Sequence, residues 1–468
     1  MMQRFHQLAQ NYPETRGATE RIRDSDEIYR EFASLKAAEQ SSRCLQCGVP
    51  FCQVHCPLHN NIPDWLKLVA EGRLKEAYEV SSATNNFPEI CGRICPQDKL
   101  CEGNCVVNKD FGAITIGAVE KYITEVAWKE GWITGFAPVH EQPLSVAIIG
   151  AGPAGLAAAE TLRRKGIQVH IYDRHDRAGG LLIYGIPNFK LDKKIVSRRI
   201  AQYTQSGIQF HLGVEIGRDV TLQELQSQHD AVLLATGVYQ ARELEPMPGL
   251  VLPGVLPALE FLIENNRAGL EGRTSAISAQ GKRVVVIGGG DTAMDCVRTA
   301  VRQGAVNVTC LYRRDRENMP GSAREVYHAE EEGVVFRFMS TPLEFRGQGK
   351  IEHVVVGRMR LGPADISGRR QPELIAGEKA MIEADLVIKA LGFDAEDFPS
   401  FFCMPELQLT RHGTLKVDAH SMTSVTGIFA AGDNVRGASL VVWAIADGRK
   451  VAAHILDYLA LKQAARVA

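Results

Sequence analysis

SVAIIGAGPAGLAAAETLRRKG, residues 145–166, is the stretch of sequence that decides the fold. An apolar run leads into a glycine-rich turn, and an alanine-rich segment with helical periodicity follows until Gly166. A buried strand, a glycine turn and a helix in this order begin a dinucleotide-binding βαβ unit. The next apolar run, VHIYD, ends in Asp173, where an acidic side chain can bind a ribose hydroxyl.

The turn has the spacing Gly150-x-Gly152-x-x-Gly155. The first glycine permits a tight turn, the second lets the backbone approach a pyrophosphate, and the third lets helix and strand pack closely. The helix N-terminus adds free N–H groups and a positive dipole end for the phosphate. A glycine-rich turn that binds no ligand is the alternative, and the strand, helix and acid around the turn count against it.

The same pattern returns at KRVVVIGGGDTAMDCVRTAVRQG, residues 282–304, with an offset of 138 residues from Gly150 to Gly288 (288 minus 150). Each copy later contains an apolar run closed by glycine, AVLLATG at 231–237 and ADLVIKALG at 384–392. Strands that alternate with helices form parallel sheets with helices on both faces. The sequence therefore predicts an α/β fold with two Rossmann-like dinucleotide-binding domains.

The second turn, Gly288-x-Gly290-x-x-Ala293, ends in alanine, which is an allowed variant of the fingerprint. After the following strand, NVTCLY, Arg313 and Arg314 stand where the acidic residue is usual. A guanidinium binds a 2′-phosphate by bidentate, charge-assisted hydrogen bonds, whereas a carboxylate repels it. We therefore expect the second copy to bind NADPH rather than NADH. Two solvent-exposed arginines without a ligand are the alternative.

GIFAAGDNV, residues 427–435, indicates which dinucleotide the first copy binds. Its Gly432-Asp433 pair is similar to the second flavin-binding motif of flavoproteins with two dinucleotide domains, in which the aspartate contacts the ribityl chain. The helical segment that follows could stabilise negative charge on a reduced flavin through its dipole. We expect FAD in the first copy, although Asp433 could instead only cap that helix. Neither copy has a CxxC or CxxxxC pair, which argues against a disulfide reductase.

Eight of the eleven cysteines lie between residues 44 and 105. They form two groups, Cys44-x2-Cys47-x4-Cys52-x3-Cys56-Pro57 and Cys91-x3-Cys95-Pro96-x4-Cys101-x3-Cys105. Clustered thiols in a reducing cytosol indicate a metal or catalytic site rather than disulfides. Zinc favours paired CxxC motifs, of which only one occurs, and Cys-Pro is typical of two-cluster ferredoxins. We expect Cys44, Cys47 and Cys52 on one 4Fe–4S cluster, with Cys56 crossing to a second.

The bulk composition limits the function classes. A net charge of -2 gives no sign of a nucleic-acid partner, which usually requires a basic domain. No apolar run reaches the length of a membrane span, and the polar N-terminus MMQRFHQLAQNYPETR lacks the apolar core of a secretory signal. We expect a cytoplasmic protein with no membrane contact.

Long motifs in all parts of the chain carry a resemblance to a known family. They are CLQCGVPFCQVHCP (44–57), PEICGRICPQDKLCEGNC (88–105), GAITIGAVEKYI (112–123), DRHDRAGGLLIYGIPNFKL (173–191), GGGDTAMDCVRTAVRQGA (288–305), YRRDRENMPGSAREV (312–326) and AAGDNVRGASLVVWAIADGRK (430–450). Over nearly its whole length the chain resembles the small (β) subunits of bacterial NADPH-dependent glutamate synthase. The same module occurs in dihydropyrimidine dehydrogenase and in flavin-based ferredoxin:NADP reductases.

The resemblance implies FAD, NADPH and two 4Fe–4S clusters, and it assigns their ligands. One cluster would use Cys44, Cys47, Cys52 and Cys105. The other would use Cys56, Cys95, Cys101 and a non-cysteine ligand, Glu120, which leaves Cys91 without a role. The expected dinucleotide-binding residues are Gly150, Gly152, Gly155, Asp173, Gly180, Gly237, Gly288, Gly290, Ala293, Arg313, Arg314, Gly432 and Asp433.

The resemblance also implies a domain order of the pyridine nucleotide-disulfide oxidoreductase type. Residues 1–142 form a helical iron–sulfur domain, 143–250 and 395–468 form the FAD domain in two parts, and 251–394 form the NADPH domain. Hydride passes from NADPH to FAD, and single electrons pass through the clusters to a large (α) subunit, which makes L-glutamate from L-glutamine and 2-oxoglutarate.

No catalytic side chain is expected, because the hydride chemistry belongs to the cofactor. Two other functions stay open. One is a free-standing NADPH:ferredoxin or acceptor reductase, or the electron-input subunit of another enzyme. The other is a non-catalytic docking module with a zinc-bound N-terminal domain.

Overall fold

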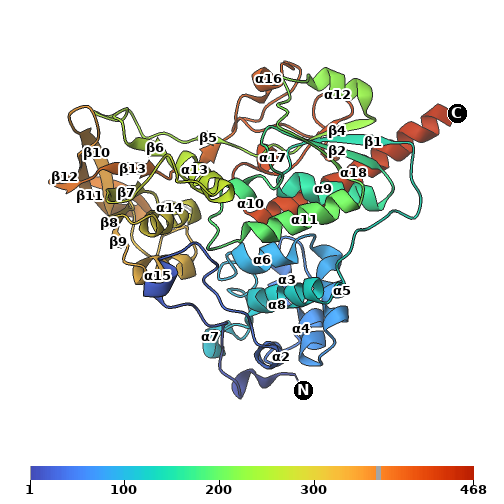
Figure 1. Cartoon of the computed structure of the whole chain (residues 1–468), viewed down its shortest axis with the longest axis horizontal. Coiled ribbons are helices and arrows are strands. Elements are labelled where there is room, and N and C mark those ends of the chain that lie inside the picture. The colour runs from blue at the N-terminus through green and yellow to red at the C-terminus, as the bar shows by residue number, and fades with distance from the viewer. Residues whose placement is uncertain (1, 365–369, 468) are drawn as a thin grey trace.

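The computed structural model describes residues 2–364 and 370–467 and arranges them in three lobes (Figure 1). One lobe is helical and cysteine-rich, and the other two are built on parallel sheets. The expected α/β fold with a preceding helical domain is confirmed. No helix of the described residues is both long and apolar enough to span a membrane.

The first dinucleotide domain contains a parallel sheet in the order β15-β4-β1-β2-β3. Its strands are β1 (Ser145–Ile149), β2 (Gln168–Asp173), β3 (Gln209–Leu212), β4 (Ala231–Leu234) and β15 (Ile428–Ala430). Its helices are α9 (Pro153–Arg164), α10 (Leu181–Tyr184), α11 (Lys193–Gln205), α12 (Leu222–Gln228), α16 (Phe398–Phe401), α17 (Asp433–Arg436) and α18 (Val441–Val467). In Figure 1, α9, α11 and α18 lie between this sheet and the cysteine-rich lobe.

The second dinucleotide domain repeats the arrangement with a parallel sheet in the order β6-β13-β7-β8-β9. Its strands are β6 (Val255–Pro257), β7 (Arg283–Ile287), β8 (Asn307–Leu311), β9 (Val335–Arg337) and β13 (Leu386–Lys389), and its helices are α13 (Ala258–Glu271), α14 (Asp291–Arg302) and α15 (Ala323–Glu331). An antiparallel sheet adds β10 (Ser340–Arg346), β11 (His353–Ala364) and β12 (Arg370–Glu383). The chain passes between the two domains through a paired ribbon of β5 (Gln240–Ala241) and β14 (Phe393–Asp394).

The cysteine-rich lobe consists of short helices. They are η1 (Arg4–His6), α1 (Ala18–Arg21), α2 (Ser34–Ser42), α3 (Phe51–Val54), α4 (Ile62–Ala70), α5 (Leu74–Thr84), α6 (Pro88–Ile94), α7 (Asn108–Phe111) and α8 (Ile116–Lys129). Residues 65–82, WLKLVAEGRLKEAYEVSS, have helical periodicity, and the structure divides them between α4 and α5. The division falls at Gly72, whose φ of 77° lies in the left-handed region that ends a helix and that glycine adopts without strain.

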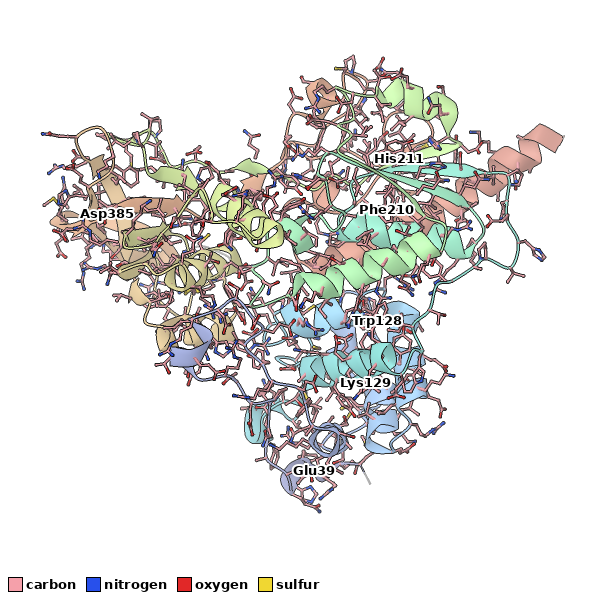
Figure 2. All side chains as sticks on the ribbon, viewed as in Figure 1. Glu39, Trp128, Lys129, Phe210, His211 and Asp385 are labelled. Carbon is pink, nitrogen blue, oxygen red and sulfur yellow. The ribbon has the colours of Figure 1, made fainter. Side chains whose placement is uncertain are left out.

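A buried ion pair joins the cysteine-rich lobe to the first dinucleotide domain. Arg199 of α11 donates two hydrogen bonds of 2.8 Å to the carboxylate of Glu89 on α6, and both side chains are buried. The neighbouring guanidinium of Arg198 lies over the ring of Trp128, 4.8 Å from its centroid. Trp128 belongs to α8 and is labelled in Figure 2. Charged groups removed from water require partners, so this pair fixes how the two lobes meet.

A second buried network holds the N-terminal segment against the second dinucleotide domain. Arg21 of α1 donates to Glu332 at 2.7 Å, and Arg298 of α14 binds the same carboxylate at 2.8 and 2.9 Å. Burial by itself would raise the pKa of Glu332, but the guanidiniums of Arg298 and Arg302 hold it well below its usual range. Buried ion pairs therefore join the cysteine-rich lobe to both dinucleotide domains. Replacing one member of such a pair with a neutral residue would leave its partner buried without a counter-charge.

Removing one partner of the Arg199–Glu89 pair tests this contact. Arg199→Ala leaves a buried carboxylate without its cation, so we expect the free energy of unfolding to fall by about 3–5 kcal/mol. Arg218→Ala is the matched control, because Arg218 pairs with Asp219 on the solvent-exposed surface, so its loss should change the free energy of unfolding far less. Urea unfolding followed by circular dichroism measures both. Equal losses for the two variants would contradict the assignment.

Candidate cofactor sites

The first glycine turn has the geometry that a pyrophosphate site needs. Gly150 has a φ of 109°, and a Cβ there would overlap the carbonyl oxygen of Ala235. A Cβ on Gly155 would overlap the carbonyl oxygen of Gly150, so helix and strand pack at backbone distance. Nothing lies within 4 Å of a Cβ placed on Gly152, which leaves open space at the N-terminus of α9 for a phosphate.

Asp173 lies at the end of β2 and is anchored to the turn. Its Oδ2 accepts a hydrogen bond from the backbone N–H of Ala151 at 2.7 Å, and its Oδ1 accepts one from His175 at 2.9 Å. A cavity beside it is lined by residues that include Gly150 and Tyr239. Each carboxylate oxygen keeps a further lone pair, so the side chain suits a ribose hydroxyl at this cavity.

The C-terminal segment closes over the same turn. A Cβ on Gly432, whose φ is 80°, would lie 2.9 Å from the Cβ of Ala154 in the first turn of α9. A Cβ on Gly180 would lie equally close to the Cα of Gly152. Burial raises the pKa of Asp433, next to Gly432, to about 6. The structure thus brings three parts of the chain that are widely separated in sequence and contain the expected FAD-binding residues Gly152, Gly180 and Gly432 to one place. Gly237 follows β4 with a φ of 76°.

The second turn repeats these features at the start of α14. Gly288 has a φ of 145°, and a Cβ there would overlap the carbonyl oxygen of Ala390. The position of Gly290 faces open space, as does that of Gly152. Ala293 is fully buried, so the second copy has room for a methyl group at the position where a Cβ on Gly155 would overlap backbone in the first copy. The two copies therefore share a geometry as well as a sequence pattern.

The structure separates the two arginines that follow β8. Arg313 is exposed, whereas Arg314 is buried with its Nε and Nη2 atoms lacking any hydrogen-bond partner. A buried guanidinium without acceptors is costly unless a ligand supplies them, and a phosphate supplies three oxygens. Asp315 turns away to cap its own loop, where it accepts hydrogen bonds from Asn318. The site therefore fits a 2′-phosphate on Arg314.

Substitution of Arg314 tests this reading. Arg314→Ala should raise the KM for NADPH about tenfold to a hundredfold, because one or two charge-assisted hydrogen bonds are lost, and should leave NADH oxidation nearly unchanged. Arg316→Ala is the control, since Arg316 pairs with Glu330 on the surface. Steady-state kinetics with both nucleotides measure the effect. An equal loss for NADPH and NADH would remove the 2′-phosphate from Arg314.

The cysteines line two separate cavities. The first is lined by Cys44, Cys47, Cys52 and Cys105, together with apolar residues that include Leu66. Burial raises the pKa of the Cys52 thiol to about 12, so a free thiol stays protonated here and a bound metal would be needed to hold the thiolate. This is the grouping that the resemblance implies for the first cluster.

The second cavity is lined by Cys56, Cys95, Cys101 and Glu120, which is the second implied grouping, and also by Cys91. Glu120 accepts a hydrogen bond from Asn85 at 3.0 Å, and burial raises its pKa to about 8. The Cys91 thiol lies 3.7 Å from Oδ1 of the same asparagine. Five candidate donors therefore surround this cavity, one more than the four that a 4Fe–4S cluster requires.

Both cavities fit iron–sulfur clusters by the chemistry of their walls. Thiols line both cavities among apolar side chains, and Ile116 at the start of α8 lines both, so the two cavities are adjacent. Spacing alone did not identify Gln46, which has a φ of 57° and donates to Cys44 Sγ at 3.3 Å and to the Pro63 carbonyl at 2.8 Å. Its amide can hold a cysteine sulfur in place and stabilise charge on it.

Two substitutions test which residue is the fourth ligand of the second cluster. We expect Glu120→Ala to lose one cluster, about four of eight irons, and to keep the other, because the remaining donors of the first cavity are untouched. Cys91→Ala, in the same cavity, should keep about eight irons. Iron and labile-sulfide analysis with spectra of anaerobic protein measures both. The reverse pattern would give the ligand role to Cys91.

The chain matches two family models. Residues 144–448 match the pyridine nucleotide-disulphide oxidoreductase family. Residues 21–132 match the model described as dihydropyrimidine dehydrogenase domain II, 4Fe-4S cluster. Fold and sites together define a pyridine nucleotide-disulphide oxidoreductase that carries a 4Fe–4S domain.

Curated relatives show which family within this class of oxidoreductases the chain resembles. The NADPH glutamate synthase small chain of Azospirillum brasilense is 58% identical over 99% of this chain and 98% of the relative. That of Escherichia coli is 49% identical over 92% of this chain and 93% of the relative. The chain belongs to the family of NADPH glutamate synthase small chains.

Among solved structures, FprA of Mycobacterium tuberculosis in complex with NADPH is similar in fold. It has a TM-score of 0.58 and 21% identity, and the match covers 69% of this chain and 86% of FprA. The likeness supports the fold of a two-domain oxidoreductase.

Proposed function

We propose that the chain is the electron-input subunit of a glutamate synthase, which oxidises NADPH and passes the electrons to a large chain. The observation that carries this proposal is the order of the sites in space. The second cysteine cavity is lined by Val442 of α18, in the first dinucleotide domain, and by Ile116, which it shares with the first cavity. A path of redox sites would thus run from the flavin domain through the cysteine-rich lobe.

The residues of the chain bind and orient the reactants. In our proposal, Gly288, Gly290 and Arg314 hold the phosphates of NADPH, and the turn at Gly150 holds those of FAD. When bound, FAD accepts two electrons as hydride and 4Fe–4S clusters carry electrons singly. The cysteine thiols of the two cavities and Glu120 would hold two such clusters among apolar side chains.

The large chain would carry out the conversion of glutamine and 2-oxoglutarate to glutamate. In this proposal the described sites of the small chain have other roles. Thiols of the cysteine-rich lobe bind clusters, and the two glycine turns bind nucleotides. The name shared by the relatives, small chain, supports a larger partner. Two proposed clusters also give a simple elemental expectation of about eight irons and eight labile sulfides per chain.

The experiment is glutamine-dependent NADPH oxidation with 2-oxoglutarate, run with and without the large chain of the same organism. We expect the chain alone to reduce an artificial acceptor such as ferricyanide and to form no glutamate, because it provides only electrons. Adding the large chain should start glutamate formation. Glutamate formation by this chain alone would contradict the division of labour.

Two other outcomes would move the assignment. If no large chain binds or restores activity while ferredoxin is reduced efficiently, the chain is a free-standing reductase. If the purified chain contains stoichiometric zinc with no labile sulfide, the helical lobe is a docking module rather than an electron carrier.

A further inference from the structure

An exposed apolar patch lies over the first cysteine cavity. Phe51 and Val106 line that cavity and are 48% and 50% exposed, so each of the two side chains lies between the cavity and the solvent. Val49 and Val54, on either side of Phe51 in sequence, are 64% and 52% exposed. We call Val49, Phe51, Val54 and Val106 the exit patch.

None of the residues that line the second cavity is exposed. Its apolar wall includes Leu58 and Val442, both buried, and the side chain of Val442 belongs to the core of the first dinucleotide domain. Of the two proposed cluster sites, the first is therefore the one at the surface. Electrons that enter from the flavin domain would reach the surface at the exit patch.

The charge of the surrounding sequence indicates the kind of partner. Residues 44–63, CLQCGVPFCQVHCPLHNNIP, contain no Asp, Glu, Lys or Arg. Small acidic electron carriers dock on basic surfaces that steer them by charge, and residues 44–63 provide no Lys or Arg for such steering. Permanent interfaces are instead apolar and depleted of charged residues at their centre.

We propose that the exit patch is the surface on which the large chain docks permanently, and through which the electrons leave. The proposal rests on the function proposed above and adds the place of contact. Oxidation of one NADPH to NADP⁺ and a proton releases two electrons, and both cross this surface singly to the acceptor in the large chain. Close apolar contact shortens the distance that the electrons cross between the first cavity and the acceptor. It also keeps water from the cavity, which lowers the reorganisation energy of the electron transfer.

The test places charge on the patch without touching the cavity walls. In the double variant Val49→Glu/Val54→Glu, two carboxylates would be buried at the interface, so we expect the Kd for the large chain to rise at least about tenfold. Ferricyanide reduction, iron content and cluster spectra should stay unchanged. Val251→Glu is the matched control, since Val251 is exposed on the second dinucleotide domain. Isothermal titration calorimetry and glutamate-forming activity measure the effect.

A second measurement avoids substitutions. Amide hydrogen exchange of the wild-type chain at residues 47–55 and 105–111 should slow when the large chain is added. Binding of the large chain with unchanged Kd for the double variant and no protection at these residues would overturn the patch alone. A wild-type chain that binds no large chain would overturn the proposed function and the patch with it. Loss of self-association or of ferredoxin reduction, with unchanged binding of the large chain, would also overturn the proposal.

Discussion

The close approach of α18 to the start of α9 is the contact on which the other features depend. A Cβ on Gly448 would overlap the carbonyl oxygen of Ala154, so the C-terminal helix crosses the glycine-turn helix at backbone distance. This crossing returns β15 to the first sheet, brings Gly432 to the first glycine turn, and places Val442 at the second cysteine cavity. One contact thereby completes the proposed flavin site and joins it to the proposed cluster sites.

Buried ion pairs fix the positions of the lobes relative to one another, as this helix crossing fixes the elements of the first domain. Apolar contact between lobes is tolerant of sliding, whereas a bidentate pair such as Arg199–Glu89 is satisfied in one arrangement only. The Arg21–Glu332 contact acts similarly at the second domain. Electron transfer falls steeply with distance, so ion pairs that fix the lobes also fix the spacing of the redox sites.

The two cysteine cavities show why the ligand groups interleave along the chain. Cys52 on α3 and Cys56 just after it lie four residues apart but line different cavities. Cys101 and Cys105 are also four residues apart, and they too line different cavities. Each short segment therefore contributes to both proposed clusters and holds them close together. Ile116, between the cavities, occupies the shared wall and excludes water from it.

Local sequence predicted much of this protein, because glycine turns and short-range cysteine spacing depend on backbone sterics within a few residues. The positive φ of Gly150 and Gly288, the open positions of Gly152 and Gly290, and the parallel α/β fold all follow from such patterns. The break at Gly72 was missed, since periodicity alone continues through it.

Tertiary structure decided what local patterns leave open. Arg313 and Arg314 are equivalent in sequence, yet packing buries one with unpaired nitrogens and exposes the other. The resemblance left Cys91 without a role, and the packing of α6 against α8 brings it into a cavity with Glu120. The ligand groups, the approach of Gly180 and Gly432 to the first glycine turn, and the exposure of Val49 and Val54 depend on segments far apart in the chain. Their positions are set by the burial of whole surfaces, which no short stretch of sequence contains.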